Sequence, residues 1–397
     1  MQNFNRYLIN TILYNNLVFI SFFAVDNLNY LWLVINFTIN VFLVLILNKY
    51  NRKILNFNIF IILSICFGFV YTSFKITSLF FTFFCIYTAI LQLTFICKNL
   101  QIFNFTKFLN NTIVLIFYFY VFQALSHIFG IPVLNAAGSA QFNESIFRYN
   151  TLMAEPSYSS FCIVLLLFFS NILDEKNNLK IELYGFLLIM LYASVLGLIL
   201  YFFYLITIHR KKYKLLFKFE LICIVIILIL FANKLNGLDR IVEIVSFFWN
   251  NNSIFDLVSI EPSGAFRILP ILIYFQKINY ITLPNFLFGF GPGASEYFFN
   301  YELFLSGYGT ADSDGKFLGG FIPAFLLDYG IIPFFVFIYI YLKSILFKKW
   351  VFQIILLFFL LLNLNINNQI FWFSFYIFFI GKYIYNNRSY NVEKNFR

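Results

Sequence analysis

Residues 181–208 read IELYGFLLIMLYASVLGLILYFFYLITI, a run of 28 residues that is apolar almost throughout. A helix that spans a membrane needs about 20 mostly apolar residues. The run therefore fits either one long tilted helix or two short helices that abut near Ala193–Ser194. The choice sets the orientation of everything before it, because one more span reverses the sides of all earlier loops.

The whole chain shares this apolar character. Of its 397 residues, 61% are apolar and 11% are charged, and the mean hydropathy is +0.83. Soluble domains are about 45–50% apolar and about 25% charged. So few charges could not cover a folded core with polar surface, which excludes a soluble enzyme, a fibrous protein and a disordered protein. The remaining class is an all-α polytopic membrane protein.

Apolar runs recur along the chain, and most of them are long enough to span a membrane. They lie at 7–25, 30–47, 58–74, 76–97, 109–130, 156–173, 215–232, 322–342, 351–363 and 369–385, besides 181–208. Positive charge settles the ambiguous run, since Lys and Arg concentrate in cytoplasmic loops. If the run is two helices, 20 of the 27 Lys and Arg share the side of the basic cluster 210–218. The other seven lie outside: Lys75, Arg148, Lys234, Arg240, Arg267, Lys277 and Lys316.

We therefore predict about 12 transmembrane helices with both termini in the cytoplasm. Residues 1–232 hold nine spans and a short outer loop at 131–155. Residues 233–320 form one large outer (periplasmic) loop, and residues 321–397 hold three spans and a cytoplasmic tail. Apolar residues at helical spacing over 238–249 predict an amphipathic helix, which either lies on the membrane surface or packs on the loop's own core.

The candidate functional residues are charged groups at the outer ends of spans, because charge at membrane depth is costly. Pro156 suits the first turn of a helix, and Glu155 suits its cap, where free N–H groups favour a carboxylate. On local physics alone, a plain capped helix with Arg148 as the ion-pair partner of Glu155 is the simpler interpretation of this segment. Arg148, Arg240 and Arg267 all lie outside, and Arg binds phosphate through a fixed fork of donors. For Arg240 a surface ion pair with its acidic neighbours is the simpler interpretation.

Three further features are interpreted more plainly. No Lys-Ser/Thr follows Gly289-Phe290-Gly291-Pro292-Gly293, so this stretch predicts a tight turn rather than a phosphate loop. The stretch Asp312-Ser313-Asp314-Gly315 lacks the full calcium-loop pattern, and the five cysteines all lie in apolar runs, so no metal site is expected. His127, near the outer end of its span, is expected to be a hydrogen-bonded core histidine.

Taken in order, these features resemble the Wzy-type polysaccharide polymerases, which form one superfamily with the O-antigen ligases. The residues that carry the resemblance are Arg148, Glu155-Pro156-Ser157, the corner Tyr192–Gly197, Arg267, the turn Gly289–Gly293, Asp312–Gly315 and Asp328-Tyr329-Gly330.

The resemblance implies a metal-independent glycosyltransferase at the outer face of the bacterial cytoplasmic membrane. Such enzymes transfer a glycan from undecaprenyl diphosphate to the non-reducing end of another lipid-linked repeat unit of O-antigen or capsule. Glu155, Asp312 and Asp314 are then the expected catalytic residues, and Arg148, Arg267 and Arg240 the expected diphosphate-binding residues. No cofactor, metal or nucleic acid is implied. The implied partners are the lipid-linked oligosaccharide, the bilayer and a chain-length regulator.

Two alternatives stay open. O-antigen ligases rely on a histidine in or near the large outer loop, whereas this chain has no histidine from 210 to 397. A flippase for lipid-linked oligosaccharides would fit the span number. Flippases usually have two similar halves with charges buried in mid-span, and the loops of this chain are asymmetric, with no acid or base evident in the middle of a span.

Overall fold

The computed structural model describes the greater part of the chain. The described residues are 2–18, 24–25, 28–47, 76–131, 149, 151–153, 156–173, 178–192, 194–209, 218, 220–222, 262–305, 320–347, 350–364 and 368–395. Over these residues the fold is helical apart from one antiparallel pair of two-residue strands, β1 (Ala24–Val25) and β2 (Leu28–Asn29). The all-α class predicted from the sequence is confirmed at this level.

The described part of the chain consists mainly of α-helices. In chain order they are α1 (Gln2–Asn15), α2 (Tyr30–Leu47), α4 (Ile76–Lys98), α5 (Phe105–Ile128), α6 (Pro156–Leu173), α7 (Leu179–Tyr192), α8 (Val195–Tyr204), α13 (Pro262–Lys277), α14 (Leu283–Phe288), α15 (Ala294–Leu305), α16 (Phe321–Tyr329), α17 (Ile331–Ile345), α18 (Trp350–Asn363) and α19 (Gln369–Asn395). A π-helical turn, Leu205–His209, extends α8, and single 3₁₀ turns lie at Leu100–Ile102 and Ile278–Tyr280.

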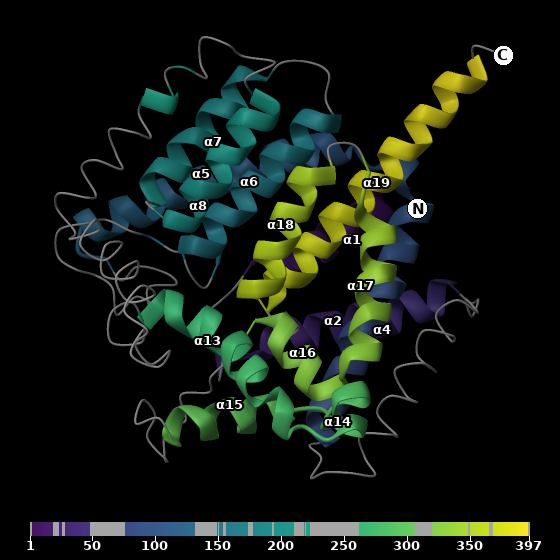
Figure 1. Cartoon of the computed structure of the whole chain (residues 1–397). Helices are drawn as coiled ribbons and strands as arrows, with labels where there is room; N and C mark the ends of the chain where they lie inside the picture. Colours follow the sequence, from purple (N-terminus) through teal and green to yellow (C-terminus); the bar gives the residue numbers. More distant parts are fainter. Residues whose placement is uncertain are drawn as a thin grey trace.

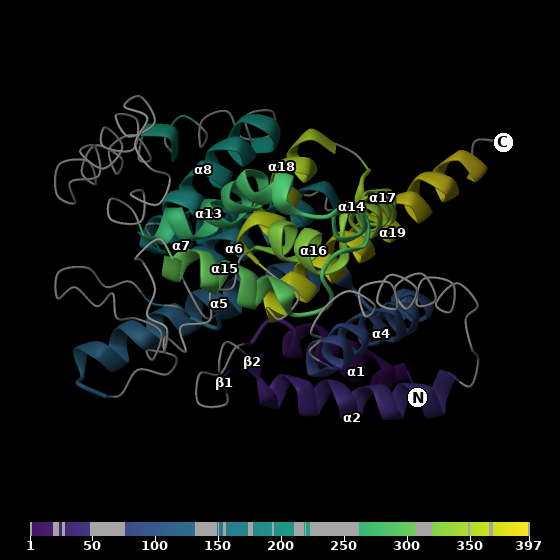
Figure 2. The same ribbon diagram turned by 60° about the horizontal axis from the view of Figure 1, so that its bottom comes forward.

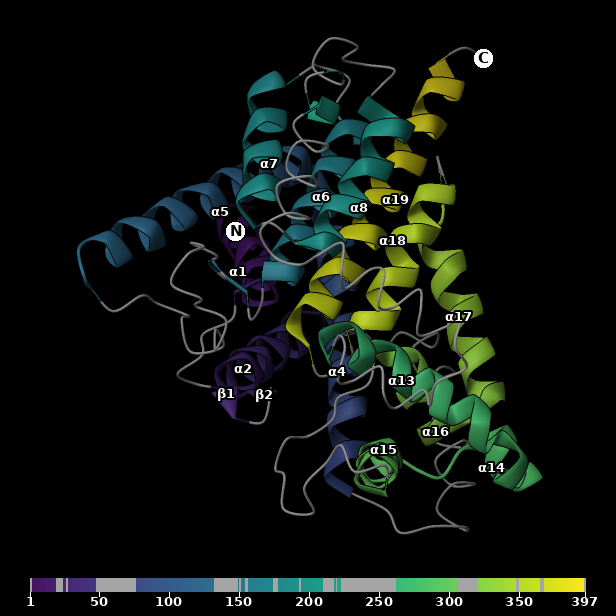
Figure 3. The same ribbon diagram turned by 60° about the vertical axis from the view of Figure 1, so that its left-hand side comes forward.

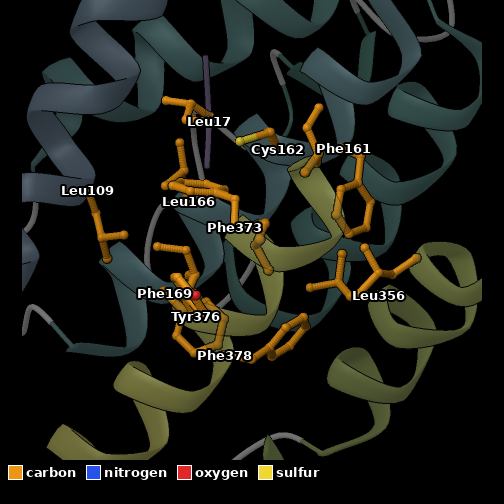
Figure 4. Packing of buried hydrophobic residues seen from close by; sticks show 14 of the residues in the cluster. Leu17, Leu109, Phe161, Cys162, Leu166, Phe169, Leu356, Phe373, Tyr376 and Phe378 are labelled. Carbon is orange, nitrogen blue, oxygen red and sulfur yellow. The ribbon is translucent and has the colours of Figure 1, made fainter. Parts of the chain in front are cut away.

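Helix α6 is the centre of the main bundle. Each residue from Phe161 to Phe169 is at most 3% exposed. A helix that is apolar on all sides has to be surrounded, and α6 packs against α5, α7, α8 and α19 (Figure 1). Its aromatic side chains interleave with those of α19, where Phe169 meets Phe378 edge to face with ring centres 5.3 Å apart (Figure 4). This packing holds α6 in place, and the candidate site is described from the first residues of α6.

Helices α1, α2 and α4 form a second group beside the bundle (Figure 2). Two hydrogen bonds join α2 to α4: the Asn40 amide donates to Thr88 (2.6 Å), and the Gln92 amide donates to Asn36 (2.7 Å). Tyr376 of α19 donates to Gln92 Oε1 (2.8 Å) and ties the group to the bundle. Polar side chains between apolar helices commonly join them in this way, since lipid offers these groups no partner.

Large apolar side chains lie exposed in stripes along α2 and α5. The stripes are Val34, Phe37, Val41 and Val44 on α2, and Leu115, Tyr118, Phe122 and Leu125 on α5, each 41–62% exposed. Their spacing of three and four residues keeps each stripe on one helix face. Among the described residues, α5 is the one helix both long and apolar enough to cross a membrane, and several shorter helices are equally apolar. Figure 3 shows α5 reaching away from the bundle. The fold therefore suggests a membrane protein, while the number of spans stays a prediction.

The run 181–208 forms two helices, as the distribution of charge predicts. Helix α7 ends at Tyr192, and α8 begins at Val195 with Ser194 as its cap. Tyr204, at the end of α8, donates a hydrogen bond to Glu182, near the start of α7. The two helices therefore run antiparallel and return the chain to the end of the bundle from which it came.

The predicted span 322–342 is two helices and not one. Gly330 separates α16 from α17, with φ at +80°, and a side chain there would clash with the backbone of Phe288 and Gly289. The hydropathy continues across the break, because the interruption is caused by a contact with the preceding loop. That loop contributes α13, α14 and α15, all of which pack against α16. Helices α14 and α15 lie at the opposite end of the molecule from the C-terminus (Figures 1 and 3).

The first predicted span, 7–25, is also shorter than expected. Helix α1 ends at Asn15, and the chain turns where the Asn16 side chain donates to Ile12 O (2.8 Å) and accepts from Trp32 Nε1 (3.0 Å). This pairing of Asn16 with α2 replaces further turns of helix. The predicted span 58–74, most of 215–232 and the predicted amphipathic helix 238–249 lie outside the described residues.

Candidate functional site

The residues predicted for the site are mostly beyond the described part of the chain. Outside the described residues lie Arg148, Glu155, Arg240, Asp312 and Asp314. Arg267 lies in α13, although its side chain is not among those described. The site therefore has to be built from the described residues that flank these positions.

The turn at residues 151–153 precedes Glu155 and α6, and side chains of two other helices hold it in place. Thr151 has φ at +54°, a left-handed conformation that β-branched residues rarely adopt. Its N–H donates to Gln123 Oε1 of α5 (2.9 Å), and its hydroxyl lies 2.9 Å from the Tyr192 hydroxyl of α7. Such a conformation costs on the order of 1–3 kcal/mol and persists only where the surroundings enforce it. Side chains from α5 and α7 supply that enforcement.

The start of α6 joins the same buried cluster of hydroxyl groups. The Ser159 hydroxyl lies 3.3 Å from that of Thr151, and both residues are fully buried. Helix α6 begins at Pro156, so the prediction of a helix start there is confirmed. We call Thr151, Ser159 and Tyr192 the hydroxyl cluster, to which Gln123 contributes an amide oxygen.

The corner between α7 and α8 packs against this start of α6. Gly197 lies against Ser160 so closely that a side chain at Gly197 would clash with it. Ser194 caps α8 by accepting a hydrogen bond from the Gly197 N–H (3.4 Å). Two stretches that the sequence singled out, the approach to Glu155 and the corner Tyr192–Gly197, are therefore neighbours in the fold.

Tyr149 links the turn to His127. The Tyr149 hydroxyl lies 3.1 Å from His127 Nδ1, and its ring meets Tyr120 edge to face with centres 5.2 Å apart. Tyr149 is buried, and burial raises the pKa of its phenol, so the phenol stays protonated at neutral pH. The expectation for His127 was half right: it is hydrogen-bonded, but its side chain is exposed and not in the core.

The glycine-rich stretch 289–293 is the predicted tight turn, and it meets the second singled-out motif. Gly289, Gly291 and Gly293 all have φ between +81° and +98°. The Asp328 carboxylate accepts from Ser295 N (2.7 Å) and Gly293 N (3.2 Å). A phosphate loop would need those N–H groups for its ligand, and here Asp328 occupies them. The turn therefore attaches the start of α15 to the end of α16.

Helix α13, which carries Arg267, packs against the helices on both sides of this contact. It contacts both α15 and α16, and Lys277 at its end forms an ion pair with Glu302 of α15 (2.9 Å). Tyr274 of α13 packs with Leu326 and Leu327 of α16 in a small separate core. Helix α13, which bears Arg267, therefore packs against both helices that the Asp328 contact joins.

A buried acidic cluster was missed by sequence reasoning. Glu182 and Glu220 are 2% and 0% exposed, and Tyr204 donates to both Glu182 oxygens (2.9 and 3.0 Å). Asn171 of α6 donates to Glu182 and to the Tyr204 hydroxyl. The available signal was a glutamate inside each of two apolar runs, but neither run indicates that the two residues meet.

In the described part of the chain, no group of three His, Cys, Asp or Glu side chains is placed to bind a metal ion. No family model, no curated protein and no solved structure matches the chain.

Proposed function

We propose that the protein is a membrane polysaccharide polymerase of the Wzy type. It transfers a glycan from undecaprenyl diphosphate to the non-reducing end of another lipid-linked repeat unit, at the outer face of the bacterial cytoplasmic membrane. Arg148 and Arg267, with Arg240, hold the diphosphate, and Glu155, Asp312 and Asp314 supply the carboxylates.

The chemistry asks little of the protein beyond placement. Diphosphate is already a good leaving group, so the residues have to align two substrates, stabilise the departing negative charge and accept the proton of the acceptor hydroxyl. The arginines perform the second task through forked N–H donors. A carboxylate performs the third, either directly or by orienting an arginine.

The observation that carries the proposal is the enforced turn before α6. Thr151 holds its left-handed conformation through Gln123 and Tyr192, and Glu155 follows four residues later, just before the first residue of α6. Strained backbone of this kind concentrates at functional sites. The motif Glu155-Pro156-Ser157 therefore follows a turn that is held by side chains of α5 and α7.

One observation favours a second candidate, a transporter of lipid-linked oligosaccharide. Glu182 and Glu220 are buried among apolar helices, and ionisable residues in such places commonly belong to ion or proton pathways. A ligase is the weaker alternative, because the chain has no histidine after His209.

The polysaccharide that a defective variant still exports distinguishes a polymerase from a transporter. Glu155→Gln keeps the shape of the side chain and removes its charge. At normal protein level, this variant should export single repeat units, seen on a polysaccharide gel as one short band without a ladder. Loss of a transporter would instead trap the units inside and give neither band nor ladder.

Glu144→Gln is the matched control, since it makes the same change in the same outer loop, and it should keep the full ladder. If Glu155→Gln, or deletion of the protein, exports no single unit in a strain able to ligate it, the polymerase proposal fails.

A further inference from the structure

Three helices bring polar groups together at the end of the bundle opposite the hydroxyl cluster. Asn171 lies near the end of α6, Glu182 near the start of α7 and Tyr204 at the end of α8. Ser159 and Tyr192 lie about 12 and 10 residues away along α6 and α7, or about 15–18 Å at 1.5 Å per residue. Glu220 joins this end from the segment after the basic cluster 210–218. On the predicted topology, this end faces the cytoplasm.

The two carboxyl groups are buried and close enough to interact electrostatically. Two negative charges in so dry a place repel strongly, because little water is present to solvate them. Tyr204 and Asn171 both donate hydrogen bonds to Glu182. Uptake of a proton by Glu220 relieves the repulsion and leaves these hydrogen bonds in place.

Tyr201 belongs to the same buried cluster. The residue is fully buried. The hydroxyl interacts electrostatically with both Glu182 and Glu220, and its ring stacks on Tyr204 at 5.6 Å.

We propose that Glu182 and Glu220 form a proton-binding site that exchanges with the cytoplasmic side, with the proton carried by Glu220. A proton from water converts the Glu220 carboxylate to the neutral acid, and its release restores the carboxylate. No bond other than O–H forms or breaks. The described titratable groups that face the pair are the phenols of Tyr201 and Tyr204. Lys180 and Lys218 lie nearby in sequence, with exposed side chains.

The test uses the purified full-length protein in detergent and dicyclohexylcarbodiimide, an apolar reagent that adds to protonated carboxyl groups. The labelled residue is located by mass spectrometry after labelling over a series of pH values. Glu220 should be modified at neutral pH, and its labelling should fall as the pH rises. Because the wild-type protein carries this test, a variant that misfolds cannot decide it, and no glycan substrate is needed.

Two variants sharpen the assignment. Glu220→Gln should abolish labelling of the cluster. Glu182→Gln removes the neighbouring carboxyl group, so Glu220 should then lose its proton, and its label, at a lower pH than in the wild type. Glu302→Gln, which alters a glutamate of the outer loop, should leave the Glu220 profile unchanged.

Three results would overturn the proposal. Glu220 could stay unlabelled across the whole pH series in folded protein. The label could fall on Glu182 instead. Sodium or potassium chloride alone could block the label at constant pH and constant ionic strength, which would make the cluster a metal-cation site.

Discussion

Arg267 lies in α13, at the end of the molecule where the turn Gly289–Gly293 is fastened to α16. If it binds diphosphate, the geometry of its donors should matter as well as its charge. Arg267→Ala should then lower chain extension by about 10²–10³-fold, the usual loss when one charge-stabilising donor is removed from a site. Arg267→Lys should retain little activity, and Arg148 should behave alike. The measurement is the length distribution of polysaccharide on a gel at matched protein level.

Arg6→Ala is the control for this prediction, because Arg6 is an exposed residue of α1. A full ladder from Arg267→Ala would remove Arg267 from the site. A full ladder from Arg267→Lys alone would show that a point charge is enough.

At the residue scale, chemistry was easier to predict from sequence than conformation or partnership. Pro156 as the first residue of α6 follows from its fixed φ and missing N–H. The left-handed Thr151 has no sequence signal, since it depends on Gln123 and Tyr192, which are distant in the chain. Glu182 was overlooked for the same reason, because its partner Tyr204 is recognised only after the hairpin has closed.

At the element scale, Asp328 is the residue whose substitution should lower the stability of the fold most clearly. It accepts hydrogen bonds from Gly293 N and Ser295 N at the start of α15. Asp328→Ala should destabilise this attachment by about 0.5–2 kcal/mol, the usual range for a lost helix cap. The expected result is a lower thermal unfolding temperature of the purified protein in detergent.

Asp328→Asn tests the same contact more gently. An amide oxygen can still accept one of the two hydrogen bonds, so this variant should fall between the wild type and Asp328→Ala. An unchanged unfolding temperature in Asp328→Ala would show that the carboxylate does not hold α15.

The elements themselves were predicted with uneven success. The division of 181–208 followed from the distribution of Lys and Arg, which reports on the whole chain and so could resolve a local ambiguity. The break at Gly330 was missed, although Asp328-Tyr329-Gly330 had been noticed as a motif. Hydropathy alone cannot detect it, because the break is needed only where Gly289 approaches Gly330.

At the scale of the whole molecule, the prediction is one of orientation. Reporter fusions at Asn252 and Lys212 should lie on opposite sides of the membrane, with Lys212 in the cytoplasm. A fusion after Arg397 should agree with Lys212. If Asn252 and Lys212 report the same side, residues 233–320 do not lie outside the membrane. The proposed site is then not at the outer face.

Composition averages over the entire chain, so it predicts a membrane protein and hence an all-α fold, of which the described residues confirm the helical class. The number of spans was not settled in the same way, since several helices are short and their lengths depend on packing. Helix α6 illustrates this. It is surrounded by α5, α7 and α8, which are near it in sequence, and by α19, which lies far along the chain. Composition predicts that such a helix is buried, but not which helices bury it.

The hairpin of α7 and α8 also constrains how the chain enters a bilayer during synthesis. Helix α7 has 14 residues, or about 21 Å, and α8 has 10 residues followed by a π-helical turn of five, whereas the hydrocarbon layer is about 30 Å thick. Neither helix is long enough to partition alone, and α7 also carries Glu182. The insertion machinery would therefore receive the two as one unit, released only after α8 has emerged from the ribosome. Tyr204, near the last turn to emerge, would then shield the carboxylate from the lipid at the moment of release.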